Sequence, residues 1–290
     1  MRADFHTHSV YSDGEKTPEE LMLLAKSAGV RLLSITDHDV SPDPEEFFSF
    51  AKSTGLFFLP GIEFTTFDKE QIHILGYGCR RTEEYLATLS AVLRGREERN
   101  RIILKNLAAA GCPLRFEEID RNASGFFGTV QIIRQMVRRG YVKDYADGMA
   151  RYFYTGAPGY VKEKRLSPKE AVRVIRQAGG VPVLAHPGKM KKLSFPEQEK
   201  LVVELKDEGL FGIESHYSSH TESETDAYIR LAKKYDLFSS VGSDFHGHER
   251  PEHVGTPAHS LTEEEIRKLC EAIHVPSLSA IENEYCTAKK

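Results

Sequence analysis

Histidines and carboxylates recur at one kind of place in this 290-residue sequence, directly after short runs of apolar residues. The first such place reads Asp4-Phe5-His6-Thr7-His8, and later ones read Thr36-Asp37-His38-Asp39 and Gly242-Ser243-Asp244-Phe245-His246. In an extended chain, residues two apart project to the same side, so a His-x-His pair can hold one ion. Neutral imidazoles and carboxylates are ligands for zinc, manganese and iron. The pattern therefore predicts a metal site.

Seven of the twelve histidines lie at such places, together with several acidic residues. The histidines are His6, His8, His38, His73, His186, His220 and His246, and the acidic residues are Asp13, Glu63, Glu214 and Asp244. A single histidine at the end of a strand is more often a hydrogen-bonded structural residue than a ligand. Burying so many ionisable groups together without a metal would be costly, however. The set as a whole therefore favours metal binding, although no single member does.

Seven short apolar runs alternate with helical patterns and are the elements that must position these groups. The candidate strands are Arg2–Phe5, Arg31–Thr36, Leu56–Ile62, Gln71–Tyr77, Val181–Ala185, Phe211–Glu214 and Phe238–Gly242. Capping boxes at Thr17, Ser167, Thr221 and Thr262 mark helix starts between or after them. We predict an α/β fold, a distorted (β/α)7 TIM-like barrel, whose functional side chains lie at the C-terminal ends of the strands. The connection from Ile62 to Gln71 is too short for a helix and marks an irregularity.

A basic segment interrupts this alternation. Residues 80–165 hold 17 Lys and Arg against 10 Asp and Glu, whereas the whole chain has a net charge of -4. No strand is expected there, and helical patterns cover Glu83–Ala110, Val130–Gly140 and Asp144–Tyr152. We predict that residues 1–81 and 166–290 form the barrel with the metal site. Residues 82–165 then form a helical insert domain that contributes to substrate binding.

Composition narrows the class of protein. No apolar run approaches the roughly 18 residues of a membrane helix, and the N-terminus lacks the apolar core of a secretory signal, so we expect no membrane association and a cytoplasmic location. The four cysteines form no Cys-x-x-Cys pair and are expected to be reduced thiols. An isoelectric point near 6.3 and the lack of aromatic stacking motifs argue against a long nucleic-acid groove.

Taken together, the motifs resemble those of the polymerase and histidinol phosphatase (PHP) family. The resemblance rests on the clusters above and on Ser12-Asp13-Gly14, Gly61-Ile62-Glu63, His73-Ile74-Leu75-Gly76, Ala185-His186-Pro187-Gly188, Gly212-Ile213-Glu214 and His220. It implies a distorted (β/α)7 barrel with a trinuclear metal site that hydrolyses phosphate esters. By motif, His6, His8, Glu63 and Asp244 would hold the first ion, Glu63, His73 and His186 the second, and Asp13, His38 and His246 the third. The expected cofactors are two to three divalent ions of Mn, Zn or Fe.

The interrupted barrel is similar to the branch of the family that acts on nucleoside 3′,5′-bisphosphates, nucleoside monophosphates or short 5′-phosphorylated oligoribonucleotides. That branch commonly carries Gly-Arg-x-His-x-x-Arg in the insert, where this chain keeps only Gly128 and Arg134. A frequent Ala-His-Pro-Gly-Arg ends here in Lys189, which preserves the charge but not the fork of arginine. We expect Arg134, Lys189 and His220 to bind the substrate, a small phosphorylated nucleotide or short oligonucleotide.

The expected chemistry is attack by a hydroxide that bridges two ions joined by Glu63, with charge on the phosphoryl oxygens balanced by the ions and by Lys189 or Arg134. Asp13, His38 and His220 are candidates to protonate the leaving oxygen; if a third ion is bound, Asp13 and His38 are its ligands instead. Two alternative functions stay open. One is a histidinol-phosphate phosphatase, which usually lacks such an insert, and the other is a non-catalytic metal-binding module.

Overall fold

The computed structural model describes residues 1–162, 165–247 and 253–286. The chain divides into two compact units, the first made of Met1–Thr88 with Leu166–Lys290 and the second of Leu89–Arg165. No helix within the described residues is both long and apolar enough to span a membrane.

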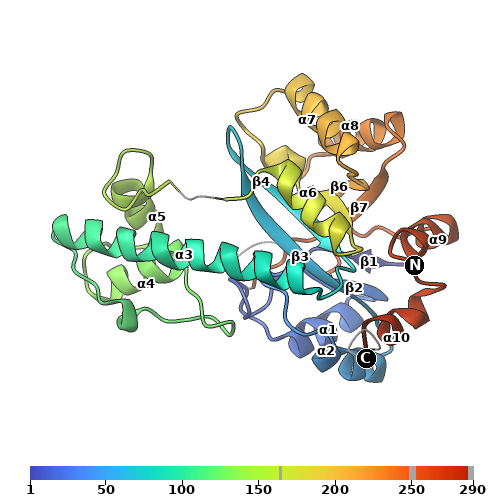
Figure 1. The fold of residues 1–290 in the computed structure, drawn as a ribbon, viewed down its shortest axis with the longest axis horizontal. Helices are drawn as coiled ribbons and strands as arrows, with labels where there is room; N and C mark the ends of the chain where they lie inside the picture. The colour runs from blue at the N-terminus through green and yellow to red at the C-terminus, as the bar shows by residue number, and fades with distance from the viewer. Residues whose placement is uncertain (163–164, 248–252, 287–290) are drawn as a thin grey trace. The chain divides into compact units, whose positions relative to one another are not determined.

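The first unit is built on a seven-stranded sheet whose strands follow one another in chain order. Its strands are β1 (Ala3–Asp4), β2 (Leu32–Ile35), β3 (Phe57–Phe67), β4 (Gln71–Tyr77), β5 (Val181–Leu184), β6 (Gly212–Tyr217) and β7 (Phe238–Gly242). Backbone hydrogen bonds from Phe5 to Val241 and from Asp244 to His6 link the last strand back to the first. The sheet therefore curls into a nearly closed barrel with helices around it (Figure 1), which confirms the predicted fold class.

The short connection after Ile62 is a β-hairpin. Strand β3 continues to Phe67, five residues beyond the predicted end, and pairs antiparallel with β4 from Gly61↔Tyr77 to Phe67↔Gln71. Strand β4 also pairs antiparallel with β5, while all other neighbouring strands are parallel. The start of β4 therefore lies at the same barrel end as the C-terminal ends of the parallel strands.

The helices around the barrel are α1 (Pro18–Ser27), α2 (Glu45–Thr54), α6 (Pro168–Gln177), α7 (Phe195–Asp207), α8 (Glu222–Lys234), α9 (Glu263–Ala272) and the short α10 (Ile281–Cys286). Four of them, α1, α6, α8 and α9, begin where the sequence signals predict. Complete capping boxes stand at Thr17, Ser167, Thr221 and Thr262, each satisfying backbone donors that the first helical turn leaves unpaired. Fully buried side chains such as Leu21 of α1 and Leu33 of β2 belong to the core between helices and strands.

The described residues of the second unit form helices, turns and loops, with no strand among them. Helix α3 (Glu83–Ala109) begins in the first unit and continues into the second. It is followed by a 3₁₀ turn (Phe116–Glu118), α4 (Thr129–Arg138), α5 (Tyr145–Gly148) and a π-helical turn (Met149–Phe153). Buried side chains on three of these segments, including Leu107, Ile133 and Phe153, form a separate apolar core.

Candidate metal centre

The barrel brings the predicted histidines and carboxylates together at one end. His6 and His8 follow β1, His38 follows β2, and Asp244 and His246 follow β7. His186 follows β5, and Glu63 lies within β3. His73 stands near the start of β4, which reaches the same end because that strand runs antiparallel. His73 pairs with Thr65, which lies two residues beyond Glu63 in β3. The side chains of His73 and Glu63 therefore lie on the same face of the hairpin.

Four of these residues, His6, His8, Glu63 and Asp244, form a fully buried group. The Nε2 atoms of His6 and His8 lie 3.3 and 3.2 Å from Asp244 Oδ1, and each lies 3.3 Å from an oxygen of Glu63. Ligands bound tetrahedrally at about 2.0–2.1 Å are separated by about 3.3–3.4 Å. Neither Nε2 atom makes a hydrogen bond, nor does Glu63 Oε2. Buried polar atoms at this spacing fit a shared divalent ion.

Glu63 also joins this group to a second one. Its Oε1 lies 2.7 Å from His73 Nδ1 and 3.1 Å from His186 Nε2, and its Oε2 lies 2.9 Å from His38 Nδ1. With His6 and His8, five imidazoles surround one carboxylate. A carboxylate placed between two groups of imidazoles would be a ligand available to an ion in either group.

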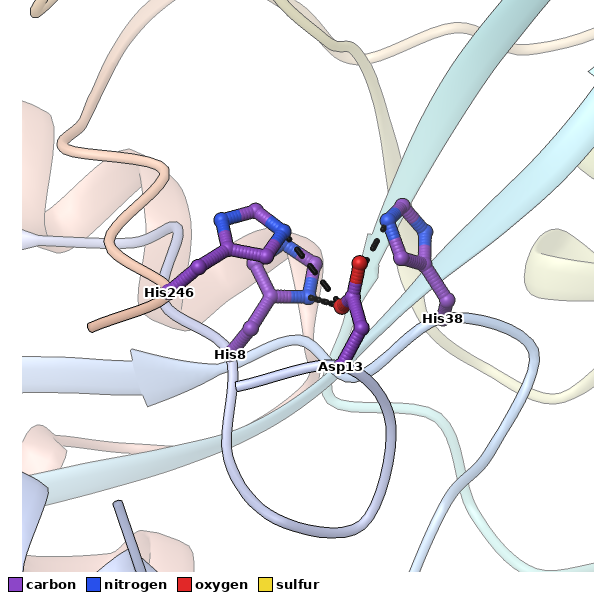
Figure 2. Close-up of side chains that lie close together, drawn as sticks. All are labelled: His8, Asp13, His38 and His246. Carbon is purple, nitrogen blue, oxygen red and sulfur yellow. Dashed lines mark ion pairs between the residues drawn. The ribbon is translucent and has the colours of Figure 1, made fainter. Parts of the chain in front are cut away.

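A third group surrounds Asp13, as Figure 2 shows. Asp13 Oδ1 lies 3.3 Å from His246 Nε2, 3.8 Å from His8 Nδ1 and 4.0 Å from His38 Nε2. The three residues expected from the sequence, Asp13, His38 and His246, thus lie together. His8, which the sequence motifs assign to the first ion alone, joins them through its second ring nitrogen.

The ionisation of these groups is strongly perturbed. Burial opposes the charge of Glu63, but the imidazoles of His73 and His38 outweigh it and hold the pKa of Glu63 well below its usual value. Histidine neighbours lower the pKa values of Asp13 and Asp244 against burial in the same way. For His8, burial disfavours the imidazolium, but the adjacent carboxylates of Asp244 and Glu63 raise its pKa to about 9. The raised pKa of His8 and the lowered pKa values of Glu63 and Asp244 show that this group of residues favours positive charge, which a bound metal ion would also supply.

At two other histidines of the centre, burial lowers the pKa. It lowers the pKa of His73 to about 4, because the nearby Glu63 only partly compensates the lost hydration. Burial also lowers the pKa of His246, with the charge of His8 adding to the effect. Both imidazoles are therefore neutral at pH 7, the form in which histidine binds a metal.

Two candidate ligands have unusual backbone conformations. Asp244 (φ 55°) and His186 (φ 23°) both adopt positive φ, which costs a residue other than glycine about 1–3 kcal/mol. The cost at Asp244 is offset by backbone hydrogen bonds on either side, including its own N–H to His6 O at 2.8 Å. Such conformations cluster at functional sites because the surrounding fold imposes them.

Glu214 supports the centre from behind. Its Oε1 lies 2.9 Å from His6 Nδ1, and its Oε2 accepts the His186 N–H at 2.6 Å. A carboxylate on the far ring nitrogen fixes the orientation of a metal-binding histidine. The position of Glu214 at a strand end indicates no role by itself, and the hydrogen bond to His6 assigns one.

The residues expected to bind substrate lie in different surroundings. Lys189 Nζ lies 2.6 Å from Asp244 Oδ2. His220 Nε2 accepts the Gly188 N–H at 3.1 Å, and its Nδ1 lies 3.1 Å from Ser215 O. Both ring nitrogens of His220 are thus used by the backbone, and burial lowers its pKa. Arg134 lies on α4 in the second unit.

Comparison with known proteins places this arrangement in a family. Residues 4–155 match the model of the PHP domain. The chain is similar to a 3′,5′-nucleoside bisphosphate phosphatase of Chromobacterium violaceum, with 34% identity over 84% of this chain and 86% of the relative. It is also similar to a 5′-3′ exoribonuclease of Haemophilus influenzae, with 31% identity over 84% of this chain and 89% of that one. A solved structure from Bifidobacterium adolescentis, of a protein proposed to be a metal-dependent phosphoesterase, shares the fold with a TM-score of 0.79 at 23% identity over 93% of this chain and 96% of its own. The chain therefore belongs to the PHP domain family, as its motifs predicted.

Proposed function

We propose that this protein is a metal-dependent phosphoesterase that hydrolyses phosphate esters of nucleotides, with nucleoside 3′,5′-bisphosphates, nucleoside monophosphates or short 5′-phosphorylated oligoribonucleotides as substrates. The observation that carries the proposal is the buried Glu63 carboxylate, whose two oxygens face five imidazoles. Its three neighbouring ligand groups would hold about two to three divalent ions such as Mn, Zn or Fe.

When bound, such ions stabilise negative charge on phosphoryl oxygens and make water nucleophilic near neutral pH. The protein residues supply the rest. Glu63 belongs to the first and the second ligand group and so links them. Glu214 orients His6 toward Asp244 and Glu63. Lys189, whose side chain is half exposed, provides a positive charge next to Asp244 for a substrate phosphate.

The proton for the leaving oxygen has fewer sources than the sequence suggested. Because both nitrogens of His220 engage the backbone, we assign His220 to holding the turn that carries Lys189. Asp13 and His38, which face each other in the third group, are the remaining candidates to donate this proton or to bind a third ion.

The enzyme class is confirmed by the comparisons, because relatives that match most of the chain are named phosphatase, exoribonuclease and diphosphodiesterase, all hydrolases of phosphate esters. The names of the bisphosphate phosphatase and of the exoribonuclease also support nucleotide substrates. We further propose that residues 82–165 act as a substrate-binding insert and that Arg134 binds a phosphate beyond the scissile one.

A substrate panel tests the proposal. Metal-reconstituted protein is assayed for release of inorganic phosphate or mononucleotide. The panel contains a nucleoside 3′,5′-bisphosphate, a nucleoside monophosphate, a 5′-phosphorylated oligoribonucleotide and histidinol phosphate. We expect turnover of one or more nucleotide esters and little of histidinol phosphate. Preferential hydrolysis of histidinol phosphate would support the alternative phosphatase, and metal binding without any turnover would support a non-catalytic module.

A further inference from the structure

The two oxygens of Asp244 have different partners. Oδ1 faces the unpaired Nε2 atoms of His6 and His8 at 3.3 and 3.2 Å. Oδ2 instead lies 2.6 Å from the Lys189 ammonium and accepts the Tyr217 hydroxyl at 2.9 Å. One oxygen is thus directed at the metal centre, and the other is bound by two protein donors.

Tyr217 reaches Asp244 because of an irregularity in β6. In a regular strand, residues three apart point to opposite faces, yet both Glu214 and Tyr217 contact the metal centre. The pairing of β6 with β7 shifts between Glu214 and His216, which marks a β-bulge. A bulge inserts one residue and redirects the side chains that follow it, and here it brings Tyr217 to the side of Glu214.

The surroundings of Tyr217 hold its ring in place. The residue is 2% exposed, and its ring centre lies 5.4 Å from that of His186 and 5.0 Å from that of His220. The Lys189 ammonium lies 5.0 Å from the same ring centre, a favourable position for a cation. The ring thus also positions the second donor to Asp244.

We propose that Tyr217 is a positioning residue that, together with Lys189, occupies Oδ2 of Asp244 and reserves Oδ1 for the ion shared with His6 and His8. This inference rests on the proposed metal-dependent function. A buried carboxylate oxygen that loses its donors must find another partner, and the nearest one is the ion itself. Asp244 would then take a second coordination position that a water or substrate oxygen needs. Because Lys189 is half exposed and can turn toward a substrate phosphate, the buried Tyr217 hydroxyl is the donor that stays.

The test compares Tyr217→Phe with Tyr228→Phe. Tyr228 is also buried in the barrel unit and its hydroxyl donates one hydrogen bond, to Gln198 Oε1 at 2.9 Å, away from the ligand groups. Affinity for Mn²⁺ or Zn²⁺ is measured without substrate, by competition with a chelating dye, and kcat and KM are measured separately. For Tyr217→Phe we expect metal affinity to fall about tenfold or more and kcat to fall with little change in KM. Tyr228→Phe should match the parent protein in all three quantities.

Equal metal affinity in Tyr217→Phe and Tyr228→Phe would overturn the inference. If Tyr217→Phe does not fold, the half-exposed Lys189 provides the test. Lys189→Gln removes only the charged donor and leaves the Tyr217 hydroxyl on Oδ2, so it should keep the metal affinity of the parent protein. A loss of metal affinity of about tenfold or more in Lys189→Gln would show that Lys189, not Tyr217, holds Oδ2 and would overturn the inference. Failure of the parent protein to bind metal would instead overturn the proposed function itself, so the two failures are distinguishable.

Discussion

Replacing Glu63 with glutamine is the sharpest perturbation of the centre, because the side chain keeps its shape and loses one ligand atom and the charge. Glu63 Oε1 faces His6, His73 and His186, and Oε2 faces His8 and His38, at 2.7–3.3 Å. An amide has one oxygen and one nitrogen that only donates. In either orientation of the glutamine amide, its NH₂ group replaces one of the two Glu63 oxygens. The histidines that face this position lose the carboxylate oxygen they share.

Both function and stability should respond. Loss of one essential electrostatic group in an active site typically lowers kcat by about 10²–10³, or about 3–4 kcal/mol. In the metal-free protein the substitution also removes a buried anion that His6 and His8 require, and breaking such a pair costs about 3–5 kcal/mol. The assays are kcat on a nucleoside 3′,5′-bisphosphate, bound metal per chain, and thermal unfolding with and without metal. Glu170→Gln, the same chemical change in the α6 capping box, is the matched control.

The rate and the metal content of Glu63→Gln together test the role of Glu63. If Glu63→Gln keeps more than about a tenth of the parental rate, the lost transition-state stabilisation is below about 1.4 kcal/mol. With bound metal also unchanged, Glu63 would not be the residue that joins the two groups.

Three further predictions address other parts of the protein. The pKa of His8 is raised to about 9 from 6.5, so protonation of His8 contributes on the order of 3 kcal/mol to the free energy of unfolding. This contribution is complete below pH 6.5 and is lost as the pH rises through 9. The melting temperature of the metal-free protein should therefore fall between pH 7 and 10, and saturating metal should remove that fall; identical pH profiles would contradict the assignment. Gly242→Ala should abolish metal binding, because the added methyl group would overlap Glu214 Oε1 and His6 Cβ and displace His6. Elemental analysis measures the bound metal, and a metal content equal to that of the parent protein would contradict this prediction. Arg134→Ala should lower kcat/KM by about tenfold or more on a bisphosphate and hardly at all on an aryl monophosphate, whereas equal losses would place Arg134 at the reacting phosphate or in the fold.

The parts of the fold that could be predicted are those encoded locally. Capping boxes such as Thr17-Pro18-Glu19-Glu20 place helix starts, because three or four neighbouring residues satisfy their own backbone donors. Short Val-, Ile- and Leu-rich runs identify buried strands, and polar residues at their ends identify the functional end of the barrel. The family prediction, which depended on these motifs, is confirmed.

The features that could not be predicted depend on contacts between distant segments. The end of β3 at Phe67 is set by its pairing with β4, not by its own residues. The position of Tyr217 depends on a bulge, which changes the face of every later residue without any signal in β6 alone. His8 contacts two ligand groups because its two ring nitrogens face opposite sides, which the His-x-His spacing does not reveal.

If this chain hydrolyses nucleotide phosphate esters through metal ions held around Glu63, hydrolysis depends on bound metal. The most direct measurement follows inorganic phosphate released from a nucleoside 3′,5′-bisphosphate while protein stripped by a chelator is titrated with Mn²⁺, with bound metal determined in the same samples. We expect no release from stripped protein and release that rises with bound metal until about two to three ions are held per chain. Undiminished release by the stripped protein would contradict this expectation.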